Sequence, residues 1–94
     1  MSKKENCGIL VYFKGTVQGV GFRFTAQKTA RNFLITGYVK NLPDGRVEAK
    51  IEGSKDEIEK YLEVLTQRMA AYINEVTKKD YTPEGKYNSF VIEC

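Results

Sequence analysis

Hydrophobic and polar residues alternate along the chain with two different periods, which predict different elements. From Gly8 to Lys14 the residues are apolar and rich in strand formers, and this predicts a first strand. The glycine-rich stretch 15–21 then predicts a tight loop. From Phe22 to Leu34 the spacing is that of one face of a helix, with apolar or small residues at Phe22, Ala26, Ala30, Phe33 and Leu34.

The middle of the chain predicts a hairpin followed by a second helix. Two β-rich segments, 37–41 and 46–52, flank the sequence Leu-Pro-Asp-Gly at 42–45, whose glycine suits a turn. Ser54 with Glu57 three residues later is a capping-box pattern. The helix that it begins runs to about Met69, because apolar residues follow at three- and four-residue steps: Ile58, Tyr61, Leu62, Leu65 and Met69.

The last quarter of the chain predicts two more strands. Residues 71–79 are β-rich, a turn is expected around Pro83, Glu84 and Gly85, and 87–93 alternate again. If these strands form a hairpin, the last one returns toward the end of the sheet where the 15–21 loop lies. The hairpin would also keep Cys94 far from Cys7, and we expect both thiols to be free.

The resulting order, β-α-β-β-α-β plus a short terminal strand, predicts an α+β fold of the ferredoxin-like type. It has an antiparallel sheet with two helices on one face. A right-handed crossover makes the first and second strands run in the same direction. The loop after the first strand and Asn41, at the end of the second, should therefore meet at one end of the sheet.

Length and composition fit one small domain. The chain has 94 residues, 41% of them hydrophobic and 29% charged, which is enough for one two-layer core; we therefore expect a single domain over 1–94, with 1–7 as a flexible N-terminal extension. No apolar run approaches the ~20 residues of a membrane span. The polar start leads directly into a strand, so we expect a cytoplasmic protein with no membrane association.

The charged and nucleophilic residues limit the possible chemistry. The net charge of +3 helps to attract anions without predicting a nucleic-acid partner. The chain has no histidine, which removes the commonest general base and metal ligand, and its two cysteines lack the spacing of a zinc site. We expect no metal and no cofactor.

The loop 18–22 and Arg23 are the candidate anion site. A glycine-containing loop that leads into a helix can point successive N–H groups inward, and an arginine at the helix start can hold two phosphate oxygens. The alternative is that the glycines only form a turn and Arg23 is a solvated helix residue. The nucleotide P-loop, dinucleotide and cysteine-phosphatase patterns are absent from this loop.

Two longer motifs resemble the signatures of the acylphosphatase family. They are Gly15-x-Val17-Gln18-Gly19-Val20-x-Phe22-Arg23 and Gly37-Tyr38-Val39-Lys40-Asn41-x-x-x-Gly45-x-Val47-x-x-x-x-x-Gly53. The resemblance implies a metal-free hydrolase of acyl phosphates, in which Arg23 and Asn41 are the catalytic residues. It also implies a phosphate-binding loop made of Gln18, Gly19, Val20, Gly21 and Phe22. The expected partners are small-molecule acyl phosphates and inorganic phosphate, and we expect a monomer.

The same residues also allow other interpretations of the function. Local sequence alone favours Asn41 as a turn cap before Pro43, whereas the resemblance makes its amide the group that orients the attacking water. A non-catalytic module that senses a phosphate ligand would keep the loop and Arg23. An RNA-binding domain would use Phe22, Phe24 and Tyr38 for base stacking, but we expect these aromatic residues to lie in the core.

Overall fold

The computed structural model describes residues 6–94, and the first five residues of the expected N-terminal extension, 1–7, lie outside the described part. Strand β1 begins at Cys7. The elements are β1 (Cys7–Gly15), α1 (Phe22–Ala30), β2 (Ile35–Asn41), β3 (Val47–Gly53), α2 (Lys55–Arg68), a 3₁₀ turn (Ala70–Tyr72), β4 (Ile73–Tyr81) and β5 (Phe90–Glu93).

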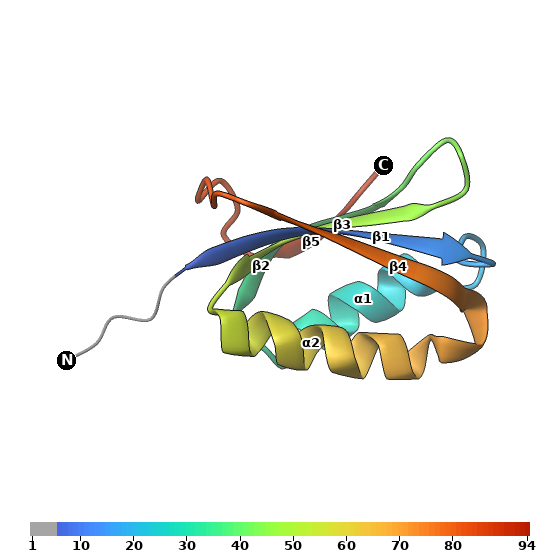
Figure 1. Cartoon of the computed structure of the whole chain (residues 1–94), viewed down its shortest axis with the longest axis horizontal. Helices are drawn as coiled ribbons and strands as arrows, with labels where there is room; N and C mark the ends of the chain where they lie inside the picture. The colour runs from blue at the N-terminus through green and yellow to red at the C-terminus, as the bar shows by residue number, and fades with distance from the viewer. Residues whose placement is uncertain (1–5) are drawn as a thin grey trace.

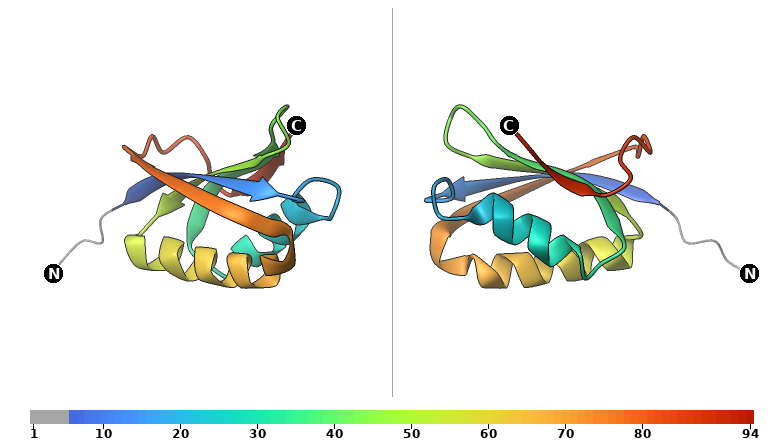
Figure 2. Two further views of the ribbon diagram at one scale, coloured as in Figure 1. Left: turned by 45° about the vertical axis from the view of Figure 1, so that its right-hand side comes forward. Right: turned by 180° about the vertical axis from the view of Figure 1, so that it is seen from behind.

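The five strands form one sheet in the order β4-β1-β3-β2-β5, and both helices cover the same face of it (Figures 1 and 2). β1 and β2 each pair antiparallel with β3, so they run in the same direction, as predicted. The ferredoxin-like α+β fold is confirmed. The sheet is antiparallel over β4, β1, β3 and β2, but β5 joins β2 in parallel and makes the whole sheet mixed.

The prediction that the last two strands form a hairpin is wrong. β4 pairs with β1 at one edge of the sheet, whereas β5 pairs with β2 at the other. The carboxylate of Glu52, in the central strand β3, accepts hydrogen bonds from the Tyr81 hydroxyl at 2.6 Å and from the N–H groups of Glu84 and Gly85 at 2.9 and 3.0 Å. These contacts hold the connecting segment against the sheet while it crosses from one edge to the other.

The helix boundaries agree with the prediction at α2 and differ at α1. The Ser54 hydroxyl accepts the Glu57 N–H at 3.2 Å and caps α2 as expected. α1 ends at Ala30, one turn before the predicted Leu34, because the N–H groups of residues 31–33 each bond to the carbonyl three residues earlier and tighten the chain. Leu34 is 81% exposed, and its N–H donates to the Glu57 carboxylate at 2.7 Å.

The core lies between the sheet and the helices. Alternate residues of β1 and β3, with Val39 of β2, meet one face of α1 and of α2. The Tyr61 hydroxyl of α2 donates to the Ala26 carbonyl of α1 at 2.9 Å, which joins the helices inside the core. Fully buried members are Val11, Phe13, Val17, Ala26, Val39, Val47, Ala49, Ile51, Tyr61 and Leu65.

The expectation that three aromatic residues are core holds for one of them. Phe22 is buried and its ring lies 4.9 Å from the ring of Phe13. Tyr38 is half-buried on the outer face of the sheet, beside Tyr87. Phe24 was wrongly predicted as core: it is 64% exposed, because as the third residue of α1 it lies off the stripe that faces the sheet.

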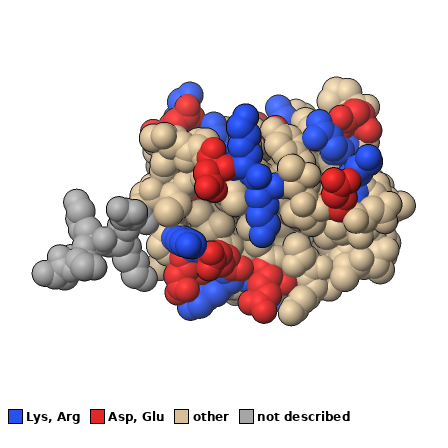
Figure 3. Space-filling model, in the orientation of Figure 1, with Lys and Arg blue, Asp and Glu red and all other residues tan. Residues whose placement is uncertain are grey.

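Basic and acidic side chains are interspersed on the face of the molecule seen in Figure 3. No helix within residues 6–94 has the length and apolar character needed to cross a membrane.

Candidate active site

The loop between β1 and α1 projects from the same end of the sheet as the β2–β3 turn (Figures 1 and 2). Within it Gly19 and Gly21 have φ angles of 81° and 78°, in the left-handed region where a side chain is strained. A Cβ atom at either position would meet nothing within 4 Å. Both glycines are therefore required by backbone conformation, and the space beside them is open.

The start of α1 presents backbone donors without partners. Gly21 occupies the N-cap position and no side chain caps the helix. The first backbone hydrogen bond of the helix joins the Thr25 N–H to the Gly21 carbonyl at 3.0 Å, and in the described part of the chain the N–H groups from Gly19 to Phe24 donate no hydrogen bond. A helix start of this kind attracts anions through its N–H groups and its positive dipole end.

Arg23 is the second residue of α1, and its position is fixed by its buried neighbour. Phe22 packs against Phe13 of β1, which holds the first turn of the helix against the sheet. The half-buried Arg23 side chain donates one long hydrogen bond, 3.4 Å from Nη1 to the Glu93 carbonyl. Within residues 6–94 no carboxylate forms an ion pair with it. Its guanidinium therefore keeps most of its donors for a ligand.

Asn41 is the last residue of β2, where it pairs with Val47 of β3. Its side chain forms no hydrogen bond with another residue of the described chain. The turn that follows is closed by other groups: the Gly45 N–H donates to the Leu42 carbonyl at 3.1 Å, and the Arg46 N–H donates to the Asp44 carboxylate at 3.1 Å. Asp44 therefore has the capping role that local sequence suggested for Asn41.

Gln18 joins the loop to the β2–β3 turn. Its Nε2 donates to the carbonyls of Leu42 and Arg46 at 2.8 and 2.9 Å. These bonds fix the loop relative to the strand end that carries Asn41, and they direct the Gln18 side chain toward the turn. Sequence reasoning missed this contact because its partners lie 24 and 28 residues away, beyond any local pattern.

One small cavity brings the candidate residues together. Its volume is about 210 Å³, and it is lined by Val17, Gly19, Gly21, Phe22, Arg23, Phe24, Asn41 and Ile92. Five of the seven predicted site residues are in this set. Gln18 and Val20 are not, since Gln18 faces the turn and Val20 packs against the core. Sequence analysis did not predict Val17, Phe24 or Ile92 as lining residues.

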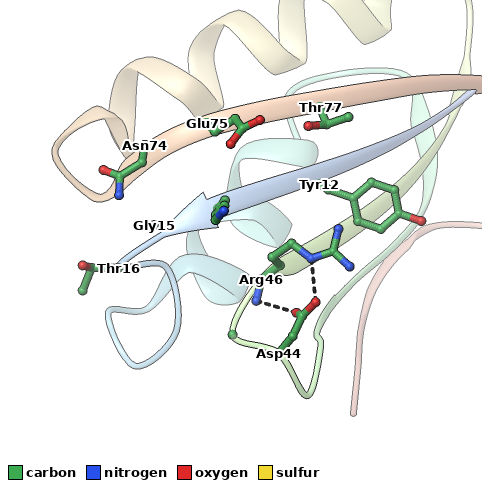
Figure 4. Close-up of a pocket in the computed structure, with 10 residues that line it drawn as sticks. Tyr12, Gly15, Thr16, Asp44, Arg46, Asn74, Glu75 and Thr77 are labelled. Carbon is green, nitrogen blue, oxygen red and sulfur yellow. Dashed lines mark hydrogen bonds and ion pairs between the residues drawn. The ribbon is translucent and has the colours of Figure 1, made fainter.

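A larger depression of about 770 Å³ lies on the outer side of the same end of the sheet, between the β2–β3 turn, β1 and β4 (Figure 4). Its arginine is already paired: Arg46 Nε lies 2.9 Å from the Asp44 carboxylate, and the guanidinium lies 4.8 Å from the centre of the Tyr12 ring. Lys14 adds a second positive charge and Glu75 a second carboxylate, so the charges of the lining residues balance. Despite its size, this depression is a poorer site for a multiply charged anion than the smaller cavity.

Burial raises the pKa of Tyr61 in the core, and the other large pKa shifts belong to the outer face of the sheet. Burial and the neighbouring Glu52 raise the pKa of Tyr81, and burial and the neighbouring Glu48 raise that of Tyr38. Burial also raises the pKa of Glu52, but three hydrogen bonds to its carboxylate outweigh this and leave the pKa below the ordinary value. The small cavity has no carboxylate, thiol or imidazole among its lining residues. It therefore offers hydrogen-bond donors and an amide rather than a strong base.

No group of three or more cysteine, aspartate or glutamate side chains within residues 6–94 is arranged to hold a metal ion.

The chain is similar to known proteins over nearly its whole length. A family model described as Acylphosphatase matches residues 9–92. A protein named Acylphosphatase from Bordetella parapertussis is 41% identical over 81 residues, which cover 85% of this chain and 86% of that protein. The solved structure of acylphosphatase from Bacillus subtilis superposes with a TM-score of 0.84 at 26% identity, covering 94% of this chain and 99% of that one. HypF from T. kodakarensis has a TM-score of 0.81 at 32% identity, over 94% of this chain but 12% of HypF.

Proposed function

The chain belongs to the acylphosphatase family, and we propose that it hydrolyses the carboxyl–phosphate anhydride bond of small-molecule acyl phosphates to a carboxylate and inorganic phosphate. The proposal rests mainly on one observation. Unpartnered backbone N–H groups, the unpaired guanidinium of Arg23 and the free amide of Asn41 all meet at a cavity of about 210 Å³.

The loop and Arg23 bind the phosphoryl group. N–H groups of the loop formed by Gln18, Gly19, Val20, Gly21 and Phe22 surround its oxygens, and the positive end of α1 adds to the attraction. Arg23 contributes charge-assisted hydrogen bonds, two of which match two oxygens of a phosphate. Gln18 acts indirectly, since its side chain holds the loop in place through the turn.

Asn41 orients the attacking water. Its amide has both a donor and an acceptor, and neither is used by another residue of the described chain. A water held there attacks phosphorus in line with the bond to the leaving carboxylate. Such a reaction depends mainly on positioning and charge stabilisation. Because a carboxylate leaves readily at neutral pH, the reaction requires no strong acid from the protein. We also expect it to proceed without a metal or cofactor, as the resemblance to the family implies.

Other properties of the protein remain proposals that the sequence suggests. We expect a cytoplasmic monomer that acts without a nucleic-acid partner. The small net charge of +3 supports the last point, because nucleic-acid binding normally uses a concentrated basic surface.

The test is steady-state hydrolysis of benzoyl phosphate in excess chelator, with inorganic phosphate as inhibitor. We expect turnover that the chelator leaves unchanged and phosphate inhibits competitively. Asn41→Ala should lower kcat by about 10²-fold or more, because the water is no longer oriented, while the inhibition constant for phosphate stays the same. Asn32→Ala is the matched control, since Asn32 is an exposed asparagine in the α1–β2 connection.

Phosphate binding without turnover by the wild-type protein would reject the enzyme and favour a phosphate-sensing module. If Asn41→Ala changed kcat no more than Asn32→Ala does, the proposed role of Asn41 would be rejected. Circular dichroism of each variant separates these results from loss of folding.

A further inference from the structure

Phe24 and Ile92 expose apolar surface beside the proposed site. Four large hydrophobic residues of the described chain are exposed: Phe24 at 64%, Leu34 at 81%, Tyr72 at 38% and Ile92 at 37%. Two of the four, Phe24 and Ile92, line the cavity that contains Arg23 and Asn41. A cavity lined mainly by apolar side chains with a few polar groups is typical of a small-molecule site.

The two side chains lie next to the residues that the reaction uses. Phe24 directly follows Arg23 in α1. Ile92 is paired with Val39 of β2, two residues before Asn41 and on the same face of the sheet. Arg23 is the only charged residue among those that line the cavity. Away from the Arg23 guanidinium, the Asn41 amide and the N–H groups, the side chains of the wall are therefore apolar.

We propose that Phe24, together with Ile92, binds the acyl group of the substrate, and that the enzyme favours acyl phosphates with an aryl or branched aliphatic group. This inference rests on the proposed function. In an acyl phosphate the acyl carbon is joined to phosphorus through one oxygen, so the acyl group must lie close to the groups that hold the phosphoryl oxygens. Phe24 belongs to α1 and Asn41 to β2, so the aromatic ring and the water-positioning amide approach the cavity from different elements.

Binding of two stable analogues tests the proposal without turnover. Acetonylphosphonate and phenacylphosphonate replace the bridging oxygen of acetyl and benzoyl phosphate with a methylene group, so they differ only in the acyl substituent. By calorimetry, the wild-type protein should bind phenacylphosphonate about tenfold more tightly, because the phenyl ring covers apolar surface. Phe24→Ala should remove most of that difference and leave the affinity for acetonylphosphonate unchanged.

Two further variants separate a specific contact from a general effect. Phe24→Leu should keep part of the preference, because it remains apolar and bulky. Leu34→Ala is the matched control: it truncates a large exposed hydrophobic residue that is not among the lining residues of the cavity. We expect it to retain the wild-type preference in full.

Equal affinity of the wild-type protein for the two analogues, or an unchanged preference in Phe24→Ala, would overturn the inference and leave the proposed function standing. If neither analogue nor inorganic phosphate bound at all, the proposed function itself would fail and the inference with it. A loss of preference in Phe24→Ala that Leu34→Ala does not share supports the assignment of Phe24 to acyl-group binding.

Discussion

Two arginines, Arg23 and Arg46, lie at the same end of the sheet but in different surroundings. Arg46 is held by the Asp44 carboxylate at 2.9 Å and lies over the ring of Tyr12, on the outer face of the sheet. On the helix side, Arg23 makes a single 3.4 Å contact with a backbone carbonyl. The guanidinium of Arg46 is therefore paired within the protein, whereas that of Arg23 is available to a ligand.

The difference extends to the groups around each arginine. On the outer face, polar side chains are matched to one another: Tyr38 donates to Glu48 at 2.8 Å, and Lys50 lies 3.0 Å from Glu84. At the start of α1, N–H groups and the Asn41 amide have no partner in the described chain. A folded protein normally pairs its buried polar groups, whereas the N–H groups at a helix start are left for water or a ligand. We therefore base the proposed anion site on a concentration of unpaired donors rather than on the size of a cavity.

Substituting the two arginines separately gives the largest expected effect. Arg23→Ala should lower kcat/KM for benzoyl phosphate by about 10³-fold or more, because the charge that stabilises the transferring phosphoryl group is lost. Arg46→Ala should leave kcat/KM nearly unchanged and alter the free energy of unfolding by less than about 1 kcal/mol, because its ion pair is solvent-exposed. Steady-state kinetics and urea unfolding measure the two effects. A large loss of activity in Arg46→Ala would contradict the comparison.

The sequence predicted the fold and the meeting of the candidate site residues at one end of the sheet, because the relevant signals are local or follow from topology. The glycines of the loop, the Ser54 cap and the apolar spacing of Phe22 and Ala26 each depend on neighbours within a few residues. The right-handed crossover then placed Asn41 beside the loop. Whether Arg23 was paired could not be read from the sequence, because its possible partners are distant in the chain.

The wrong or missing predictions have two origins: partners that are distant in the chain, and the face of a helix on which a residue lies. The crossing of the tail depends on Glu52, whose partners lie about thirty residues later, at 81, 84 and 85. Gln18 likewise bonds to carbonyls beyond residue 41. Phe24 was expected in the core because it is aromatic, yet the helix turns it outward. Neither a long-range hydrogen bond nor the direction in which a residue of the first helical turn points can be predicted from the sequence alone.

Removing the hydrogen-bonded Glu52 carboxylate from the outer face of the sheet should affect stability rather than activity. Glu52→Ala leaves three donors, the Tyr81 hydroxyl and the N–H groups of Glu84 and Gly85, without their acceptor. We expect the free energy of unfolding to fall by about 2–4 kcal/mol, with kcat/KM at 25 °C unchanged. Glu63→Ala, an exposed glutamate of α2, is the control and should have almost no effect. Loss of kcat/KM in folded Glu52→Ala would mean that the two regions are coupled.

Gln18 connects the two regions, and its substitution should affect both properties modestly. Gln18→Met keeps the size of the side chain and removes the donor to the Leu42 and Arg46 carbonyls. We expect about 1 kcal/mol less stability and about a tenfold lower kcat/KM, because the loop is less well positioned. Gln27→Met is matched to it: Gln27 also donates to a carbonyl, that of Phe90 at 3.5 Å, and does not line the cavity. Equal losses of kcat/KM in both variants would refute a positioning role for Gln18.

The smallest effect is a pH dependence of stability that arises from Glu52. Its pKa in the folded protein is below the ordinary value because the hydrogen bonds to the carboxylate outweigh the effect of burial. Glu52 therefore stabilises the fold above the pKa of an unfolded glutamate, about 4.3. That stabilisation is lost as the pH falls through the lower pKa of the folded state, where the carboxylate becomes protonated.

Glu52→Gln isolates this contribution, because glutamine resembles the protonated acid at every pH. Urea unfolding of the wild-type protein and Glu52→Gln should show a difference in stability at pH 7 that becomes smaller between pH 5 and pH 3, as the wild-type carboxylate takes up its proton. Other carboxylates with lowered pKa values, such as Asp44, are present in both proteins and cancel in the difference. A difference that stayed constant over this range would show that Glu52 stabilises the crossing of the tail through its shape and hydrogen bonds alone, without a contribution from its charge.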